Sequence, residues 1–158
     1  MKLTSFIRNG VSGYGAVTND GICDLTSAIE GVSDLKDLLE TDALTRAADM
    51  ADGRPADFPI EEIEFLPLIP NARKVICVAV NYLAHAREAG RTIGEYPVLF
   101  HRHAQTQVGH QQPLLVPKVS EQLDFEGEIA VILGKGGAHI EPENAMDYVA
   151  GYSCYNEG

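Results

Sequence analysis

The chain has 158 residues, a length that suits one ordinary domain or two small ones. Its 23 acidic and 12 basic residues give a formal net charge of −11 at pH 7, which argues against nucleic acid and anionic membranes as partners. No apolar run reaches the length of a membrane span, the N-terminus lacks a signal-peptide pattern, and the three cysteines form no C-x-x-C pair, so we expect a reduced, cytoplasmic protein.

The chain opens with a pattern that is typical of short strands joined by turns. Residues 2–8 alternate between polar and apolar side chains, and residues 22–25 predict a further short strand. Asn9-Gly10 is a strong turn signal, and the Asn-Asp-Gly sequence at residues 19–21 is another. We therefore expect short strands connected by tight turns in this part.

Two helices are expected next. Residues 33–40 begin with a capping residue and carry leucines at helical spacing, and a second helix is predicted at residues 41–50. Pro67 and Pro70 then favour extended chain and mark a linker. Because residues 1–70 contain no catalytic constellation, we interpret them as a small N-terminal domain that caps or docks.

Residues 71–158 differ in character from the first part and predict a second domain. The predicted strands lie at residues 74–80, 98–103, 114–116, 123–134 and 148–155. The predicted helices cover residues 82–89 and 142–146. All candidate functional residues lie in this second part.

Two glutamates on one predicted strand form the first candidate site. Because side chains two apart on a strand share a face, Glu126 and Glu128 project together. Such neighbouring carboxylates repel each other and, when buried, also lose hydration. A hard divalent cation with oxygen ligands resolves both problems. The alternative is a solvated pair on an edge strand, which is the commoner origin of a Glu-x-Glu motif taken alone.

A histidine and a glutamate form the second candidate site. His85 and Glu88 lie three apart on a predicted helix and can touch. A carboxylate beside an imidazole orients the ring and favours its uptake of a proton, which makes His85 a candidate general base. In isolation, a solvated surface pair is the simpler interpretation.

Taken in order, the motifs of the second part resemble the fumarylacetoacetate hydrolase family of metal-dependent hydrolases, decarboxylases, lyases and isomerases. Each motif is weak alone, but their order is highly specific, and the resemblance covers residues 74–158, with residues 1–70 similar to the family's common N-terminal domain. The motifs are Lys74-Val75-Ile76-Cys77-Val78, Asn81-Tyr82-x-x-His85-x-x-Glu88, Pro97-x-x-Phe100, Asp124-Phe125-Glu126-x-Glu128, Gly134-Lys135, residues 147–152 and Asn156.

The resemblance implies an α+β fold in which a small N-terminal α/β domain, residues 1–70, precedes a mixed β-roll catalytic domain, residues 71–158. Because family catalytic domains continue further, we expect this chain to be truncated on the C-terminal side of that domain and inactive on its own. The complete protein is expected to be a homodimer.

The resemblance also implies a metal site. Glu126 and Glu128 match two carboxylate ligands of a catalytic Mg²⁺ or Mn²⁺ ion. The third ligand of the family is usually an aspartate, and this chain has Glu157 there, which keeps the ligand type but is one methylene longer. His85 and Glu88 match a catalytic dyad that activates water or moves protons.

Basic residues complete the implied site. Arg102 stands near a position that is often lysine in the family and could hold a substrate carboxylate, while Lys135 matches a position at the edge of the pocket. His101, His103 and His110 cluster in sequence around Arg102. A soft-metal site is conceivable there, but histidines of a flexible loop are the preferred interpretation.

The implied activity is divalent-metal-dependent hydrolysis of C–C bonds in 2-oxo acids or 1,3-dicarbonyl compounds, with a small oxo acid as the substrate. A decarboxylase or isomerase of the same family, acting in aromatic-compound catabolism, is the alternative, since the same chemistry serves both with different proton steps. A non-catalytic fragment with a binding or oligomerisation role is the rival from another class.

Overall fold

A computed structural model describes all 158 residues and has an α+β fold in which every paired strand is antiparallel. Contacts group the chain into two compact units, residues 1–68 with residues 108–158, and residues 69–107. None of the helices is both long and apolar enough to cross a lipid bilayer. The predicted division into domains at residue 70 stays a prediction.

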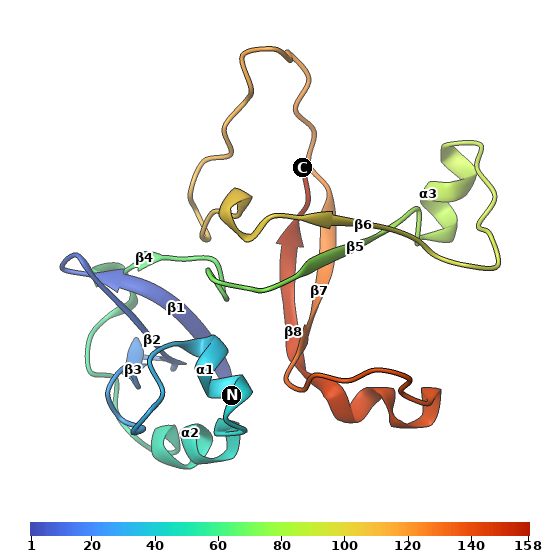
Figure 1. Cartoon of the computed structure of the whole chain (residues 1–158). Helices are drawn as coiled ribbons and strands as arrows, with labels where there is room; N and C mark the ends of the chain where they lie inside the picture. The colour runs from blue at the N-terminus through green and yellow to red at the C-terminus, as the bar shows by residue number, and fades with distance from the viewer. The chain divides into compact units, whose positions relative to one another are not determined.

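A four-stranded sheet organises the N-terminal residues, with the strand order β3-β2-β1-β4 (Figure 1). Its strands are β1 (Lys2–Arg8), β2 (Val11–Val17), β3 (Ile22–Asp24) and β4 (Glu64–Phe65). The turn between β1 and β2 consists of Asn9 and Gly10, whose φ angles are 52° and 78°. A two-residue hairpin turn of type I′ needs positive φ at both positions. The predicted turn and the first strands are confirmed.

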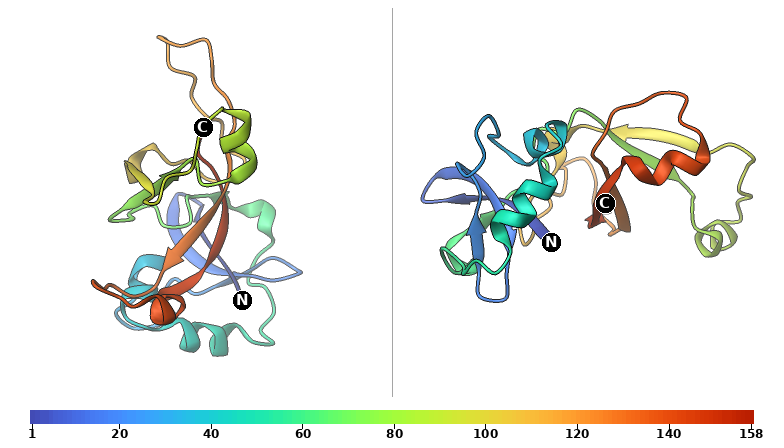
Figure 2. Two further views of the ribbon diagram at one scale, coloured as in Figure 1. Left: turned by 90° about the vertical axis from the view of Figure 1, so that its right-hand side faces the viewer. Right: turned by 90° about the horizontal axis from the view of Figure 1, so that it is seen from below.

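Two short helices lie against this sheet, as the two views of Figure 2 also show. They are α1 (Leu35–Glu40) and α2 (Leu44–Ala51), with a 3₁₀ turn η1 (Ile60–Glu62) after them. Asp34 caps α1, because its side chain accepts a hydrogen bond from the Asp37 N–H at 2.8 Å. Both predicted helices are therefore confirmed, with starts shifted by two or three residues.

The hydrophobic core of the protein lies between these helices and strands. Its larger cluster comprises Tyr14, Ala16, Cys23, Leu25, Ile29, Val32, Leu35, Leu38 and Ala47. A smaller cluster joins Phe6, Ile22 and Phe58, and the Phe6 and Phe58 rings meet edge to face with centroids 5.6 Å apart. Apolar burial of this kind makes residues 1–68 the best-packed part of the chain.

The second compact unit is built on one hairpin. It contains β5 (Val75–Ala79), α3 (Leu83–Glu88), β6 (Val98–Arg102) and the 3₁₀ turn η2 (Ala104–Thr106). Strands β5 and β6 pair antiparallel, with Val75 opposite Arg102 and Ala79 opposite Val98. The two strands and the helix predicted between them are confirmed.

The last hairpin pairs β7 (Gly127–Leu133) with β8 (Val149–Asn156), and the 3₁₀ helix η3 (Pro142–Tyr148) connects them (Figure 1). Along β7 the partly buried Glu128, Ala130 and Ile132 alternate with exposed residues. This is the predicted alternation of faces. The ladder carries an irregularity between Ile132 and Leu133.

Two details of the predicted strands are wrong. Residues 114–116 form no strand, because Pro113 and Pro117 on either side lack an N–H for a ladder, and Leu115 is left 86% exposed. Residues 123–126 precede β7 rather than belonging to it. The two-residue strand β4 is a pairing with β1 that its sequence did not predict.

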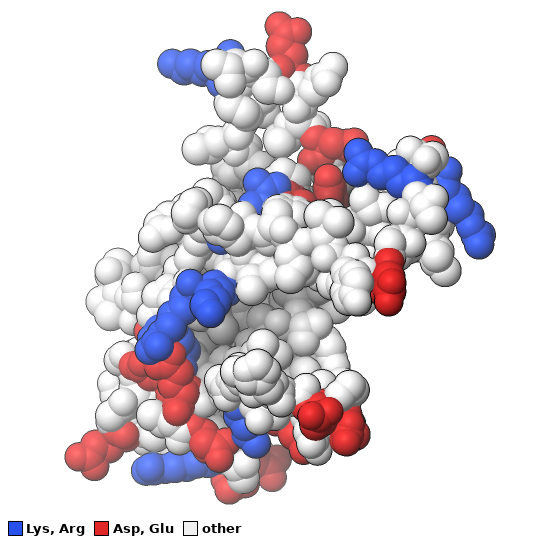
Figure 3. Space-filling model, turned by 45° about the vertical axis from the view of Figure 1, so that its right-hand side comes forward, with Lys and Arg blue, Asp and Glu red and all other residues white.

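Charged side chains are dispersed over the surface. On the face drawn in Figure 3, acidic side chains are interspersed with basic ones and no continuous basic surface forms. This agrees with the negative net charge of −11.

Two hydrogen bonds from Ser33 influence the pKa of Asp37 in α1 and hence the pH dependence of stability. The Ser33 side chain and N–H both donate hydrogen bonds to the Asp37 carboxylate, and these lower the pKa of Asp37. A carboxyl group with a lowered folded pKa stabilises the fold above its unfolded pKa, and that contribution is lost as pH falls through the folded value. We therefore predict that Ser33→Ala raises the pKa of Asp37 and destabilises the fold at neutral pH.

The matching measurements are a carboxyl NMR titration of Asp37 and urea unfolding at several pH values. The difference in unfolding free energy between wild type and Ser33→Ala is expected to shrink as Asp37 becomes protonated. A difference that stays constant through the titration of Asp37 would show that Ser33 acts in another way.

Candidate functional site

The register of the β7–β8 hairpin brings three glutamates to one end of the ladder. Gly127 pairs with Asn156 and Glu128 with Tyr155, so the next opposed pair is Glu126 and Glu157. The Glu157 N–H donates to the Glu126 carbonyl oxygen at 2.9 Å, which extends the ladder to this pair. Directly opposed residues share a face, as do residues two apart, so Glu126, Glu128 and Glu157 lie on the same face.

Asn156 fixes this end of the hairpin. Its Oδ1 accepts a hydrogen bond from the Glu126 N–H at 2.8 Å and a longer one from the Gly158 N–H at 3.4 Å. The Asn156 side chain therefore ties Glu126, the residue before β7, to the end of β8, where Glu157 follows Asn156. The sequence motif contains Asn156 but gave it no role, because the contact depends on a register that only the fold supplies.

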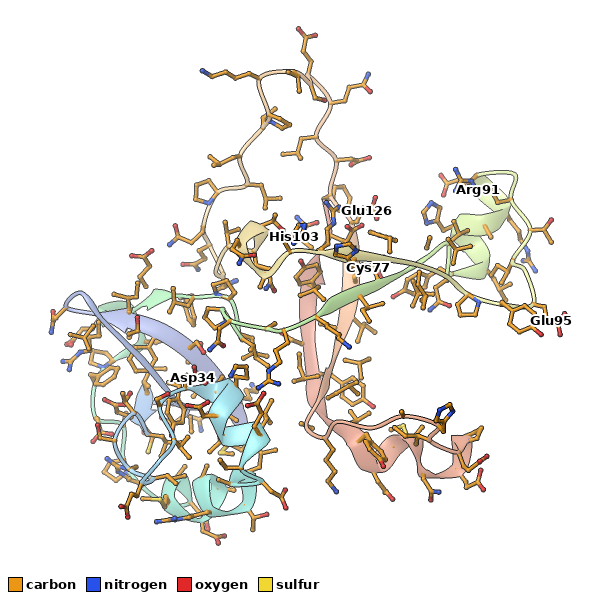
Figure 4. All side chains as sticks on the ribbon, viewed as in Figure 1. Asp34, Cys77, Arg91, Glu95, His103 and Glu126 are labelled. Atoms are coloured by element: carbon orange, nitrogen blue, oxygen red, sulfur yellow. The ribbon has the colours of Figure 1, made fainter.

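The environment of the three glutamates suits a divalent cation. Glu157 is only 9% exposed, and Glu128 is partly buried. Glu126, whose side chain is labelled in Figure 4, is exposed. Carboxylates that face each other repel, and a divalent cation between them would offset that repulsion. Carboxylate oxygens are the donors that Mg²⁺ and Mn²⁺ prefer.

The side chains themselves form no ready-made cluster. No group of three or more histidine, cysteine, aspartate or glutamate side chains is arranged so that it could hold a metal ion. The glutamates thus fit a divalent ion in donor type and in register. Their role as ligands stays a prediction.

The proposed dyad lies on α3 in the second compact unit. His85 and Glu88 are both exposed and one turn apart on the helix. No hydrogen bond or ion pair joins them. The helix therefore brings the two side chains to one face, and their catalytic coupling stays a prediction.

The two predicted substrate-binding residues are accessible. Arg102 is the last residue of β6, with its guanidinium carbon 6.0 Å from the centre of the Phe100 ring. Lys135 is exposed and follows Gly134, whose N–H donates to the Tyr148 carbonyl at 2.9 Å. Either side chain can meet an anion from solvent.

The three histidines near Arg102 do not share one setting. His101 lies in β6 rather than in a loop, and His103 follows the strand directly. His110 belongs to the other compact unit, where its ring packs edge-on against Phe65 with centroids 5.2 Å apart. The interpretation as loop histidines is therefore wrong for His101.

Comparison with known proteins points to one family. The family model described as fumarylacetoacetate (FAA) hydrolase C-terminal matches residues 74–158. Among curated proteins, the mitochondrial oxaloacetate tautomerase of Xenopus laevis is 33% identical over 115 residues, which make up 73% of this chain and 36% of that protein. The residues that the family model matches include every residue of the candidate site.

Solved structures share the fold. The maleylpyruvate hydrolase of Sphingobium sp. SYK-6, in complex with manganese(II) ion and pyruvate, is 25% identical with a TM-score of 0.77, over 98% of this chain and 57% of that one. The fumarylacetoacetate hydrolase of Exiguobacterium antarcticum is 28% identical with a TM-score of 0.67, over 99% and 55%. The chain spans 36% of the curated relative and little more than half of each solved chain.

Proposed function

Because the chain belongs to the fumarylacetoacetate hydrolase family, we propose that it forms part of the active site of a divalent-metal-dependent enzyme. The proposed substrates are 2-oxo acids or 1,3-dicarbonyl compounds, and the proposed reaction is hydrolysis of a C–C bond. The observation that supports this most is the register of β7 and β8, in which Glu126 and Glu157 face each other beside Glu128.

The three glutamates are the proposed ligands of Mg²⁺ or Mn²⁺. Such an ion, when bound, would polarise a substrate carbonyl group. The manganese(II) ion and pyruvate in the Sphingobium maleylpyruvate hydrolase support the choice of ion and of an oxo acid as substrate.

Proton transfer and substrate binding are assigned to side chains of the second compact unit and of the loop after β7. His85 would take a proton from a water molecule that attacks the substrate carbonyl, and Glu88 would orient the imidazole ring. Arg102 and Lys135 are the proposed partners of a substrate carboxylate, since both are accessible cations. We also propose a homodimer and a cytoplasmic location, although the Xenopus relative is named as mitochondrial.

Isomerisation is the second candidate function. It is favoured by the Xenopus relative, which is named as an oxaloacetate tautomerase. Keto–enol exchange needs only a proton to move between carbon and oxygen, so His85 could serve it without activating water. Decarboxylation of an oxo acid remains an alternative of the same chemistry.

A pair of assays separates these functions. With Mn²⁺ present, a C–C hydrolase converts an acylpyruvate into pyruvate and a second acid, whereas a tautomerase only speeds the exchange of enol and keto oxaloacetate. In the complete protein, we expect acylpyruvate cleavage that stops when a chelator removes the ion. Metal-dependent tautomerisation without cleavage would select the second function, and neither activity in the presence of Mn²⁺ would refute the enzymatic proposal.

Asn156 is the residue that we expect to position the glutamates. Replacing it with alanine removes the acceptor of the Glu126 and Gly158 N–H groups and loosens the end of the hairpin. We predict that Asn156→Ala lowers Mn²⁺ affinity by roughly 10–100-fold, the scale on which partners that orient metal ligands act. Isothermal titration with Mn²⁺ measures this.

Asn156→Asp is the matched control, because its carboxylate oxygen can still accept the Glu126 N–H. It should bind Mn²⁺ better than Asn156→Ala does. Equal affinities for the two variants and the wild type would remove the positioning role from Asn156.

A further inference from the structure

The proposed mechanism makes no use of the two histidines at the end of β6. His101 lies in that strand, opposite Ile76 of β5, and His103 is two residues further on. Residues two apart in extended chain project from the same face, while Arg102 between them projects from the other. The two imidazole rings accordingly meet edge to face, with centroids 5.2 Å apart and planes at 84°.

This separation is one that a shared metal ion produces. With metal–nitrogen distances of about 2.0–2.1 Å, two imidazole rings bound to one tetrahedral ion have centroids roughly 5 Å apart. The rings are thus already at the distance of a chelating pair. Rotation of each ring about its own side-chain bonds is the remaining adjustment.

Both rings are also accessible and uncommitted. His101 and His103 are exposed, and neither imidazole has a hydrogen-bond or ion-pair partner. A bound ion would therefore displace only water from their nitrogen atoms.

The backbone of His103 is held in place by the turn that follows. Its carbonyl oxygen accepts hydrogen bonds from the Thr106 N–H at 3.0 Å and from the Thr106 hydroxyl at 2.9 Å. The β5–β6 ladder holds the other histidine, since Ile76 pairs with His101. Both Cα positions are thus fixed, which reduces the entropy that binding an ion would cost.

From this geometry we infer that His101 and His103 form a binding site for a borderline transition-metal ion such as Cu²⁺, Ni²⁺ or Zn²⁺. The two imidazoles supply nitrogen ligands, and water completes the coordination because no third histidine, cysteine or carboxylate joins the pair. The site differs in chemistry from the glutamates of the β7–β8 hairpin, since imidazole suits these ions and carboxylate suits Mg²⁺.

Isothermal titration calorimetry with Ni²⁺ and with Cu²⁺ tests this site. With excess Mg²⁺ present to occupy the proposed glutamate site, we expect one further saturable site that binds Cu²⁺ more tightly than Ni²⁺, as the general order of stability for nitrogen ligands requires. His101→Ala and His103→Ala should each abolish this further Ni²⁺ site. His110→Ala and His139→Ala are matched controls, each removing one exposed histidine, and should bind Ni²⁺ like the wild type.

Two further arms keep this result separate from the proposed catalytic site. Glu126→Gln should leave Ni²⁺ binding unchanged, and a large excess of Mg²⁺ should not displace the ion. Circular dichroism checks that the histidine variants are folded. Wild-type Ni²⁺ affinity in His101→Ala or His103→Ala, loss of binding in His110→Ala, or displacement by Mg²⁺ would each overturn the assignment.

Discussion

In the full-length protein, replacing Glu126 by glutamine is expected to abolish Mg²⁺- or Mn²⁺-dependent turnover while leaving the fold intact. Glutamine keeps the shape of the side chain but removes the charge that a divalent cation needs. In the absence of metal, the variant also loses the repulsion between Glu126 and the opposed Glu157. Its unfolding free energy should therefore equal that of the wild type or rise slightly.

Turnover with Mn²⁺ and urea unfolding without metal are the two measurements for this variant. Glu121→Gln is the matched control, because Glu121 is an exposed glutamate of the segment before β7 and has no proposed role. It should retain full activity. A metal-free Glu126→Gln protein that is strongly destabilised would point to a structural role for Glu126 instead.

The second large effect is expected at His85. Removing a positioned acid–base group typically costs 10²–10⁴-fold in rate, so we predict that His85→Ala lowers kcat by roughly this factor. Because His85 belongs to the proposed dyad and not to the proposed ligands, Mn²⁺ affinity should stay nearly unchanged. Steady-state kinetics and an Mn²⁺ titration of the same variant provide both values.

His139→Ala serves as the control, since His139 is exposed and lies outside the proposed dyad. It should match the wild type in kcat. If His85→Ala instead loses metal binding in proportion to its activity, His85 is a ligand of the ion, and the assignment of the dyad is wrong.

Local sequence signals predicted most of the secondary structure. Asn9-Gly10 specifies its turn because both residues tolerate positive φ, and the observed angles are positive. The leucines at helical spacing in α1 supply Leu35 and Leu38 to the core. In these places local preference and tertiary packing agree.

The errors arose where pairing between distant segments decides the structure. An apolar run such as residues 114–116 becomes a strand only if a neighbour can complete its ladder, and Pro113 and Pro117 leave it without one. Strand β4 is the opposite case: its own sequence predicts no strand, and it becomes one because it pairs with β1. The flanking prolines are therefore a local signal against a strand at residues 114–116, whereas the pairing of β4 cannot be seen in its own two residues.

The candidate site was partly predictable for the same reason. The spacing of Glu126 and Glu128 is enough to place them on one face. Their relation to Glu157 depends on the register of β7 and β8, and the contact of Asn156 with the Glu126 N–H depends on it too. The family resemblance identified Glu157 as a candidate ligand, whereas the contact between Asn156 and the Glu126 N–H became visible only in the fold.

The central claim is that Glu126, Glu128 and Glu157 bind one divalent ion together. Electron paramagnetic resonance of free Mn²⁺ during a titration measures this directly in the wild type and in the three single glutamine variants. The proposal predicts one saturable Mn²⁺ site that excess Mg²⁺ empties, lost in each of the three variants and kept in Glu121→Gln. Mn²⁺ binding that survives in Glu128→Gln and Glu157→Gln with wild-type affinity would contradict it.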